Sequence, residues 1–284
     1  MKNLLLKSYA KINICLNVIK KREDGYHELD MVMLPLALHD SIYMEELKNA
    51  KDHFITIDDF SLGLLKYNIA TATMEKMQAK YGIDHKFRIT IHKNIPMQSG
   101  LGGGSSNSGA LINALNESCK LNMTDEEKVE IATGLGADVP FFVFTKPARC
   151  RGIGEKLDFI NVKNDYYVLI VKPSQGCSTS KVYEVSDEMK LSVCDVEKVI
   201  KALEEGDDDA LAASIGNALE EPAISLVPEI QVIKDKLLLA GFKIVQMSGS
   251  GSAVFAMSTD KKLVKSAVKA LENQYFVEMT KVLK

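Results

Sequence analysis

One stretch constrains the fold of this chain more than any other. Four glycines fall within five positions, Gly100-Leu101-Gly102-Gly103-Gly104, and Ser105-Ser106 follows them. Glycine has no side chain to pack, so such a cluster is useful where backbone N–H groups must come very close to a ligand. Apolar residues then recur at helical spacing between 110 and 115, which predicts a helix that begins behind the glycines. The N–H groups of its first turn and the positive end of its dipole favour an anion, so the stretch is predicted to bind phosphate.

Two common phosphate-binding loops do not fit this stretch. A Walker A loop ends in Gly-Lys-Ser/Thr, whereas Gly104 is followed by Ser105. A dinucleotide-binding loop needs a strand that leads straight into the glycines, whereas residues 93–99 separate them from the strand-like segment 87–92. A flexible Gly/Ser linker is the remaining alternative, but linkers do not usually lie between a patterned strand and an amphipathic helix.

Length and composition exclude several classes of protein. With 284 residues and 46% hydrophobic content, the chain has room for two globular domains. Its apolar runs are far shorter than the ~18 residues of a membrane span, and Leu4-Leu5-Leu6 is too short for the core of a signal peptide. A net charge of −3 provides no basic field for nucleic acid.

The cysteines and histidines indicate neither disulfides nor a metal cluster. The cysteines are odd in number and lie far apart, and the histidines show no ligand spacing. The cysteines are Cys15, Cys119, Cys150, Cys177 and Cys194. We therefore expect a protein of the reducing cytoplasm.

The patterns along the chain predict an α+β protein. Strands are expected over 6–18, 31–36, 87–92, 166–172, 242–247, 253–257 and 276–280, and a hairpin over 148–160. Besides the helix behind the glycines, helices are expected over 69–80, 125–134, 179–186, 194–204, 208–216, 228–240 and 260–273. The pattern changes near 173–176, which predicts two domains, 1–172 and 173–284.

The first strand carries a lysine on its polar face. Apolar residues from Ala10 to Val18 alternate with polar ones, as in a strand with one buried face. Lys11 and Asn13 are neighbours on the polar face, ~7 Å apart, so they could contact one small ligand together. A solvated lysine on an outer strand is the alternative.

Three other features each leave two interpretations open. Asp138 lies among glycines, a proline and large apolar residues, where a charge needs a partner, yet it could simply cap a helix. Tyr26 and His27 follow the tight turn at Asp24-Gly25 and could stack on and hydrogen-bond a ligand, or have no task. The Gly/Ser segment 248–252 could be a second ligand loop or a plain hairpin.

Together these motifs resemble the GHMP small-molecule kinases. The resemblance is carried by Ser8-Tyr9-Ala10-Lys11-Ile12-Asn13, by 95–106 and by Met247-Ser248-Gly249-Ser250-Gly251-Ser252. Asp24-Gly25-Tyr26-His27 and Gly136-Ala137-Asp138-Val139-Pro140-Phe141-Phe142 are similar to the branch that acts on a cytidine-diphosphate-linked methylerythritol in non-mevalonate isoprenoid synthesis. The resemblance spans nearly the whole chain and implies a two-domain α+β kinase with its active-site cleft between the domains.

The resemblance also implies roles for individual residues. Lys11 and Asp138 would be the catalytic pair, with Asp138 as base toward the substrate hydroxyl. Tyr26 and Tyr183 would lie on the faces of the cytosine, His27 at its edge and Asn13 at the methylerythritol end, with Gly249 and Ser250 also at the substrate. ATP would contact Asn68, Lys93, Pro96, Met97, Gln98, Ser99, Gly100, Leu101, Gly102, Gly103, Gly104, Ser105 and Ser106. Mg²⁺ would arrive with the nucleotide, with Ser106 as its candidate protein contact.

Some positions depart from the family pattern. Tyr9 stands where proline is usual, the segment 34–39 is atypical, and 144–151 adds cations where small residues are usual. Another GHMP kinase, acting on a mevalonate-type, sugar or homoserine alcohol, is therefore an alternative, and a non-catalytic sensor of nucleotide and ligand is a second. Small-molecule ligands, no nucleic acid, no membrane and a possible homodimer are the expected partners.

Overall fold

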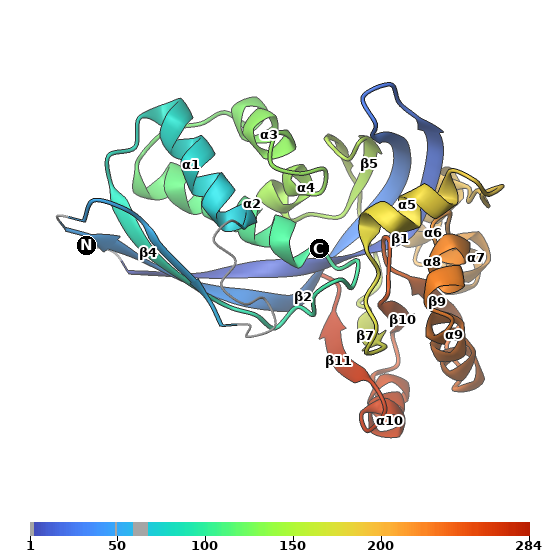
Figure 1. Ribbon diagram of the computed structural model, residues 1–284. Helices are drawn as coiled ribbons and strands as arrows, with labels where there is room; N and C mark the ends of the chain where they lie inside the picture. Colours follow the sequence, from blue (N-terminus) through green and yellow to red (C-terminus); the bar gives the residue numbers. More distant parts are fainter. Residues whose placement is uncertain (1–2, 49, 59–67) are drawn as a thin grey trace. The chain divides into compact units, whose positions relative to one another are not determined.

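The computed structural model describes residues 3–48, 50–58 and 68–284 (Figure 1). Helices and strands are mixed along the chain, as predicted. Two compact units can be distinguished. Unit 1 takes its described residues from 1–10, 38–96 and 102–145, and unit 2 from 11–37, 97–101 and 146–284. The long strands β1 (Leu4–Lys21) and β2 (His27–Leu47) contribute residues to both units.

Unit 1 is a sheet covered by helices. The second half of β2 pairs antiparallel with β4 (Lys86–His92), and β3 (Phe54–Ile57) pairs parallel with β4. Four helices lie on one face of these strands (Figure 1). They are α1 (Ile69–Tyr81), α2 (Gly103–Ser118), α3 (Asp125–Thr133) and α4 (Val139–Phe144). The core between sheet and helices includes Ile42, Met44, Met77, Ile89, Ile91, Leu111, Ile112 and Leu115.

Unit 2 contains a four-stranded antiparallel sheet of order β11-β7-β10-β9. Its strands are β7 (Tyr167–Lys172), β9 (Ile244–Met247), β10 (Val254–Ser258) and β11 (Phe276–Lys281). The hairpin of β5 (Ala148–Gly152) and β6 (Lys156–Phe159) pairs with the first half of β2, and β8 (Gly216–Asn217) pairs parallel with β1. The helices are α5 (Thr179–Ser186), α6 (Val196–Glu205), α7 (Asp208–Ser214), α8 (Glu220–Leu226), α9 (Glu229–Leu239) and α10 (Lys261–Leu271).

Most expected elements are confirmed, and the errors have simple causes. Helix α8 was not expected. Its Pro222 lies in the first turn, where the missing N–H is not needed. The short strands β3 and β8 were also missed. The expectation of a single buried face for β1 is wrong, because residues 10–17 are buried on both faces.

The structure also bears on disulfides and on membrane-spanning helices. None of the five cysteines, all of which lie in the described ranges, forms a disulfide bond. None of the helices in the described ranges is both long enough and apolar enough to cross a membrane.

Candidate active site

The first part of the glycine loop, residues 97–101, is fixed within unit 2 by the turn between β9 and β10. The backbone N–H of Ser252 donates to the carbonyl of Gln98 at 3.2 Å. The hydroxyl of Ser248 donates to the carbonyl of Gly100 at 3.0 Å. The Gly/Ser turn is therefore a hairpin connection, as in the plainer interpretation, and it also supports the loop.

Gly100 cannot be replaced by a larger residue without rearrangement. Its φ is +74°, a left-handed conformation that L side chains rarely adopt. A Cβ atom at this position would lie 1.9 Å from the carbonyl oxygen of Ser248. The glycine thus allows the loop to lie directly against the turn.

The polar face of β1 meets the same turn. Lys11 and Asn13 are 3% and 1% exposed, and Lys11 Nζ donates to Asn13 Oδ1. The N–H of Lys11 donates to the carbonyl of Leu101 at 3.1 Å. A Cβ on Gly249 would lie 3.1 Å from Lys11 Nζ and 3.2 Å from Asn13 Oδ1. Three predicted site residues are therefore together in unit 2, and the solvated-lysine alternative is wrong.

The turn also holds the start of helix α5. The hydroxyls of Ser250 and Thr179 are hydrogen-bonded at 2.9 Å. The hydroxyl of Ser252 donates to the carbonyl of Gln175 at 2.7 Å. The loop 97–101, the turn and α5 therefore form one connected group.

The second part of the glycine loop opens helix α2 in unit 1. Gly102 is the N-cap, with φ of +74°, and it makes no side-chain capping bond. A glycine cap leaves the N–H groups of the first turn uncapped by a side chain, as an anion-binding helix start requires. A Cβ on Gly103 would lie 3.2 Å from Lys93 Nζ. The lysine predicted to contact ATP therefore lies beside this helix start.

A buried carboxylate that the sequence analysis missed anchors the approach to α2. Asp40 is fully buried, and its Oδ2 accepts from Lys93 Nζ and, at 3.0 Å, from Asn107 Nδ2. Its Oδ1 accepts from the backbone N–H groups of Asn94 at 2.8 Å and Ile95 at 2.9 Å. Charged and backbone hydrogen-bond donors stabilise an ionised carboxylate in a buried position. The signal in the sequence was an acid just behind the apolar run 31–38 of β2.

This network continues to Ser106. Asn107 Nδ2 donates to Ser8 Oγ at 2.7 Å, and the Ser8 hydroxyl donates to Ser106 Oγ at 2.7 Å. All three side chains are buried. The oxygen predicted to contact a nucleotide-bound ion is thus oriented through a chain of hydrogen bonds from Asp40.

Asp138 occupies the N-cap position of α4 but its side chain does not cap the helix. Its backbone is at φ −85°, ψ −12°, outside the extended region typical of side-chain caps. Helices α2 and α4 pack closely at Gly109 of α2. A Cβ atom added to Gly109 would lie 2.8 Å from the Phe142 backbone. A Cβ on Gly136 would lie 4.0 Å from Ser105 Oγ. Asp138 is therefore at the N-cap position, as the plainer interpretation expected, but without the side-chain hydrogen bond of a cap.

Other residues predicted to contact ATP have structural tasks as well. Asn68 Oδ1 caps α1 by accepting from the N–H of Thr71 at 3.1 Å. Ser99 is buried, and its hydroxyl oxygen accepts from the N–H of Leu101 at 3.4 Å. Met97, in contrast, is one of the exposed large hydrophobic residues.

Two of the predicted base-binding residues, His27 and Tyr183, lie together in unit 2, with the carboxylate of Asp187 beside His27. The rings of His27 and Tyr183 are stacked with centroids 4.7 Å apart. Asp187, just after α5, contacts His27 Nε2 at 2.7 Å and Lys21 Nζ at 2.5 Å. The hydrogen bonds from Lys21 and His27 hold the pKa of Asp187 below its ordinary value. Tyr26 is 55% exposed. Sequence reasoning did not find Asp187.

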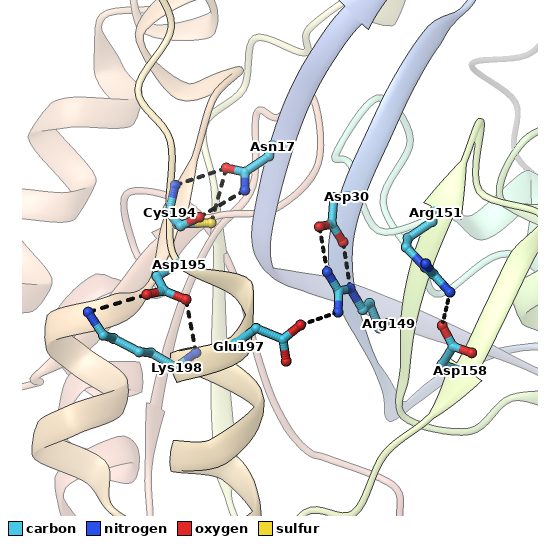
Figure 2. A network of polar contacts seen from close by, with 9 residues as sticks. All are labelled: Asn17, Asp30, Arg149, Arg151, Asp158, Cys194, Asp195, Glu197 and Lys198. Carbon is cyan, nitrogen blue, oxygen red and sulfur yellow. Dashed lines mark hydrogen bonds and ion pairs between the residues drawn. The ribbon is translucent and has the colours of Figure 1, made fainter.

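Two of the atypical cations at 144–151, Arg149 and Arg151, are engaged in ion pairs (Figure 2). Arg149 donates to both carboxylate oxygens of Asp30 at 2.8 Å and to Glu197 at 2.6 Å. Hydrogen bonding to Asp30 raises the pKa of Arg149 above its ordinary value. Arg151 pairs with Asp158 at 2.7 Å. These two arginines therefore serve contacts within unit 2.

Comparisons with known proteins place these features in a family. Residues 68–146 match the GHMP kinases N terminal domain, and residues 199–277 match the GHMP kinases C terminal domain. A protein from Alkaliphilus metalliredigens (strain QYMF), named 4-diphosphocytidyl-2-C-methyl-D-erythritol kinase, is 38% identical over 97% of this chain and 94% of its own length. A Caldicellulosiruptor bescii protein of the same name is 36% identical over 94% of this chain and 92% of its own length.

Solved structures agree with the sequence relatives. A crystal structure of 4-(cytidine 5'-diphospho)-2C-methyl-D-erythritol kinase superposes with a TM-score of 0.83 at 28% identity, covering 99% of this chain and 100% of that one. The mevalonate kinase of L. major, at 18% identity and a TM-score of 0.76, shares the fold. The chain therefore belongs to the GHMP kinases, within the family of the 4-diphosphocytidyl-2-C-methyl-D-erythritol kinases.

Proposed function

We propose that this chain transfers the γ-phosphoryl group of ATP to a hydroxyl of 4-diphosphocytidyl-2-C-methyl-D-erythritol, a step of non-mevalonate isoprenoid synthesis. The observation that carries the proposal is the family membership, with relatives of that name aligned over more than nine-tenths of the chain. The glycine-opened helix start and the pairing of His27 with Tyr183 are the features of this chain that support it.

The phosphate groups of ATP are assigned to the glycine loop, residues 96–106. Gly100 and Gly102 have positive φ, and the helix start at Gly103 offers backbone N–H groups and a positive dipole end. Phosphoryl transfer depends mainly on positioning and on stabilising the charge of the moving group. The hydrogen bonds that join the loop to the 248–252 turn support such a role.

The chemical step is assigned to Lys11 and Asp138. The Asp138 carboxylate takes the proton of the substrate hydroxyl as its oxygen forms the new bond to the γ-phosphorus. The bond from the γ-phosphorus to the bridging oxygen breaks, and that electron pair leaves with ADP. The Lys11 ammonium, buried beside Asn13, stabilises negative charge on the transferring group.

Magnesium suits this donor set only as a companion of the nucleotide. Within the described ranges, no group of three or more His, Cys, Asp or Glu side chains is placed to hold a metal ion. Ser106 offers one oriented hydroxyl oxygen, and phosphate oxygens would supply the remaining ligands. A bound Mg²⁺ would neutralise phosphate charge, and Ser106 would be its contact on the chain.

Further assignments complete the proposal. Asn13, Gly249 and Ser250 are assigned to the methylerythritol end, and Tyr26, His27 and Tyr183 to the cytosine. Residues 1–172 and 173–284 are assigned as the two family domains. The two family matches, at 68–146 and 199–277, support that division. A cytoplasmic location and a homodimer are also part of the proposal.

A turnover panel tests the function. Purified protein with Mg²⁺-ATP should phosphorylate the cytidine-bearing alcohol with a kcat/KM at least about a hundredfold above that for mevalonate, homoserine or a hexose. ADP formation and the phosphorylated product would be followed together. Preference for one of the other alcohols would assign the chain to another GHMP kinase activity, and no ADP formation with any alcohol would favour the sensor.

A further inference from the structure

Asp187 is a carboxylate to which the proposed function assigns no task. It follows the last turn of α5, four residues beyond Tyr183, and belongs to unit 2 with His27 and Lys21. Asp187 Oδ1 lies 2.7 Å from His27 Nε2, and Oδ2 lies 2.5 Å from Lys21 Nζ. The carboxylate is thus shared between a surface cation and the histidine that follows Tyr26.

The contact decides where the histidine carries its hydrogen. An ionised carboxylate can only accept hydrogen bonds. Hydrogen bonds from Lys21 and His27 hold the pKa of Asp187 below its ordinary value, so the group is ionised at neutral pH. The hydrogen of neutral His27 must therefore be on Nε2, which leaves Nδ1 with a lone pair that can accept a hydrogen bond.

The ring of His27 is also held in its plane. Its face is stacked on Tyr183 at 4.7 Å and 26°, and the His27 side chain is only 9% exposed. A ring fixed by a stacking partner and by a hydrogen bond at one nitrogen presents its other nitrogen in a defined direction. Such preorganisation lowers the cost of binding a planar group.

An acceptor of this kind distinguishes pyrimidine bases. Cytosine carries an amino group at C4, which donates, whereas uracil has a carbonyl oxygen there, which accepts. An Nδ1 lone pair directed at that position attracts the amino group and repels the carbonyl. Resting on the proposed function, we propose that Asp187 is a positioning residue that fixes the Nε2–H tautomer of His27 and so selects cytosine over uracil in the substrate.

Kinetics with two substrates test the inference. The cytidine-bearing substrate and its uridine-bearing analogue differ at C4 and in the hydrogen at N3. Asp187→Asn should raise the KM for the cytidine substrate about tenfold, consistent with losing one hydrogen bond to a charged group. The cytidine-to-uridine ratio of kcat/KM should fall by a similar factor, while kcat and the KM for ATP stay near wild type. An unchanged ratio would overturn the inference.

Two matched variants separate this role from a plain surface ion pair. Lys21→Met removes the other partner of Asp187 and should keep the cytidine-to-uridine ratio, because the carboxylate still accepts from His27. Asp158→Asn breaks the exposed pair with Arg151, also in unit 2, and should change neither parameter. If Lys21→Met lowered the ratio as much as Asp187→Asn, the carboxylate would act through general charge and the inference would fail.

A spectroscopic readout needs no substrate. Nitrogen-15 shifts of the His27 ring in the intact protein should show Nε2 protonated and Nδ1 unprotonated, and Asp187→Asn should mix the two tautomers. Protonation of Nδ1 in the neutral wild-type ring would overturn the inference while leaving the proposed function intact. Failure of the wild type to phosphorylate the cytidine substrate would overturn the proposed function and, with it, the base selection inferred for Asp187.

Discussion

Asp138 lies at the N-cap position of α4, but its side chain does not cap the helix. Its catalytic role can therefore be tested separately from a capping role. Asp138→Asn keeps the shape and removes the base, so kcat should fall by ~10²–10⁴. Helix α4 should not lose a capping contribution to stability, because the side chain makes no capping bond. Steady-state turnover and thermal unfolding would be measured on the same preparation. A near-normal kcat would remove Asp138 from the chemistry.

Lys11 should act on the same chemical step. Lys11→Ala is expected to lower kcat by a comparable factor, because it removes positive charge near the transferring phosphoryl group. If both residues serve one event, the double variant should be little worse than either single one, since such effects do not add. Losses that multiply in the double variant would mean that the two side chains act on separate steps.

Gly100 offers a sharp test of the loop's support. Gly100→Ala combines positive φ with a Cβ 1.9 Å from a backbone oxygen and should lower the free energy of unfolding by about 3 kcal/mol or more. Gly25→Ala is the matched control: its φ is +86°, but nothing lies within 4 Å of the added atom. It should cost about 1–2 kcal/mol, the penalty of the left-handed conformation alone. Equal losses in urea unfolding would refute the close approach.

Single residues were predicted from sequence where their chemistry is local. The alternation of β1 predicted that Lys11 and Asn13 share a face, and the structure confirms it. Their burial was not predictable, because it depends on Gly249, more than 230 residues later. Asp40 and Asp187 were missed for the same reason: each acquires its partners through tertiary contacts.

At the scale of elements, the start of α2 depends on one buried acid that links three segments. Asp40 in β2 holds Lys93 and the 94–95 backbone after β4, and Asn107 in α2. Asp40→Ala would leave a buried cation and two N–H groups without their acceptor, and should cost about 3–5 kcal/mol. The KM for ATP should rise as well, because Asn107, which orients Ser8 and through it Ser106, loses its bond to Asp40.

Asp58 gives the matched control for that prediction. It also accepts from the backbone N–H of Lys93, at 2.8 Å, and contacts His92, but its side chain is exposed. Asp58→Ala should cost about 1 kcal/mol or less and leave the KM for ATP unchanged. Chemical denaturation of both variants would measure their free energies of unfolding, and steady-state kinetics would measure their KM for ATP. Similar losses in the two variants would show that burial of Asp40 is not the cause.

Elements with strong end signals were predicted closely. Asn68 and Gly82 bound α1, and the capping box of Thr124 starts α3. Helix α8 lacks such a signal, and β8 has two residues, too few for any periodicity. Terminal signals are local and therefore visible in sequence, whereas short elements are formed by the neighbours they pair with.

For the whole molecule, the sequence predicted the α+β class and the family, since the motifs occur in order along the chain. It did not predict that the two compact units interleave, with 11–37 and 97–101 belonging to unit 2. Long strands such as β2, which pairs with β4 in one half and with β5 in the other, create this pattern. The pairing partners of a strand cannot be inferred from its own alternation.

The stability of the whole chain should decrease in alkali. Burial raises the pKa of Cys119, Cys177, Tyr81 and Tyr166 above their ordinary values. In the unfolded chain these groups lose protons from about pH 8.5 for thiols and about pH 10 for phenols, while the folded chain retains them. The stability they contribute is complete below those values and is lost as pH rises further. Lys172, whose pKa is lowered by burial, acts in the opposite direction.

Tyr166 should account for the steepest part of this decline. It is 1% exposed, and its hydroxyl donates to Asp208 Oδ1 at 2.6 Å. Burial, and then Asp208, raise its pKa. Tyr166→Phe should lower the free energy of unfolding at pH 7 by about 1 kcal/mol, through the lost hydrogen bond, yet show a shallower decline above pH 10 because no proton is left to lose. Asp208→Asn keeps the phenol and should give an intermediate slope. Urea unfolding at half-unit steps from pH 8 to 11 would measure it, and a Tyr166→Phe curve parallel to wild type above pH 10 would disprove the assignment.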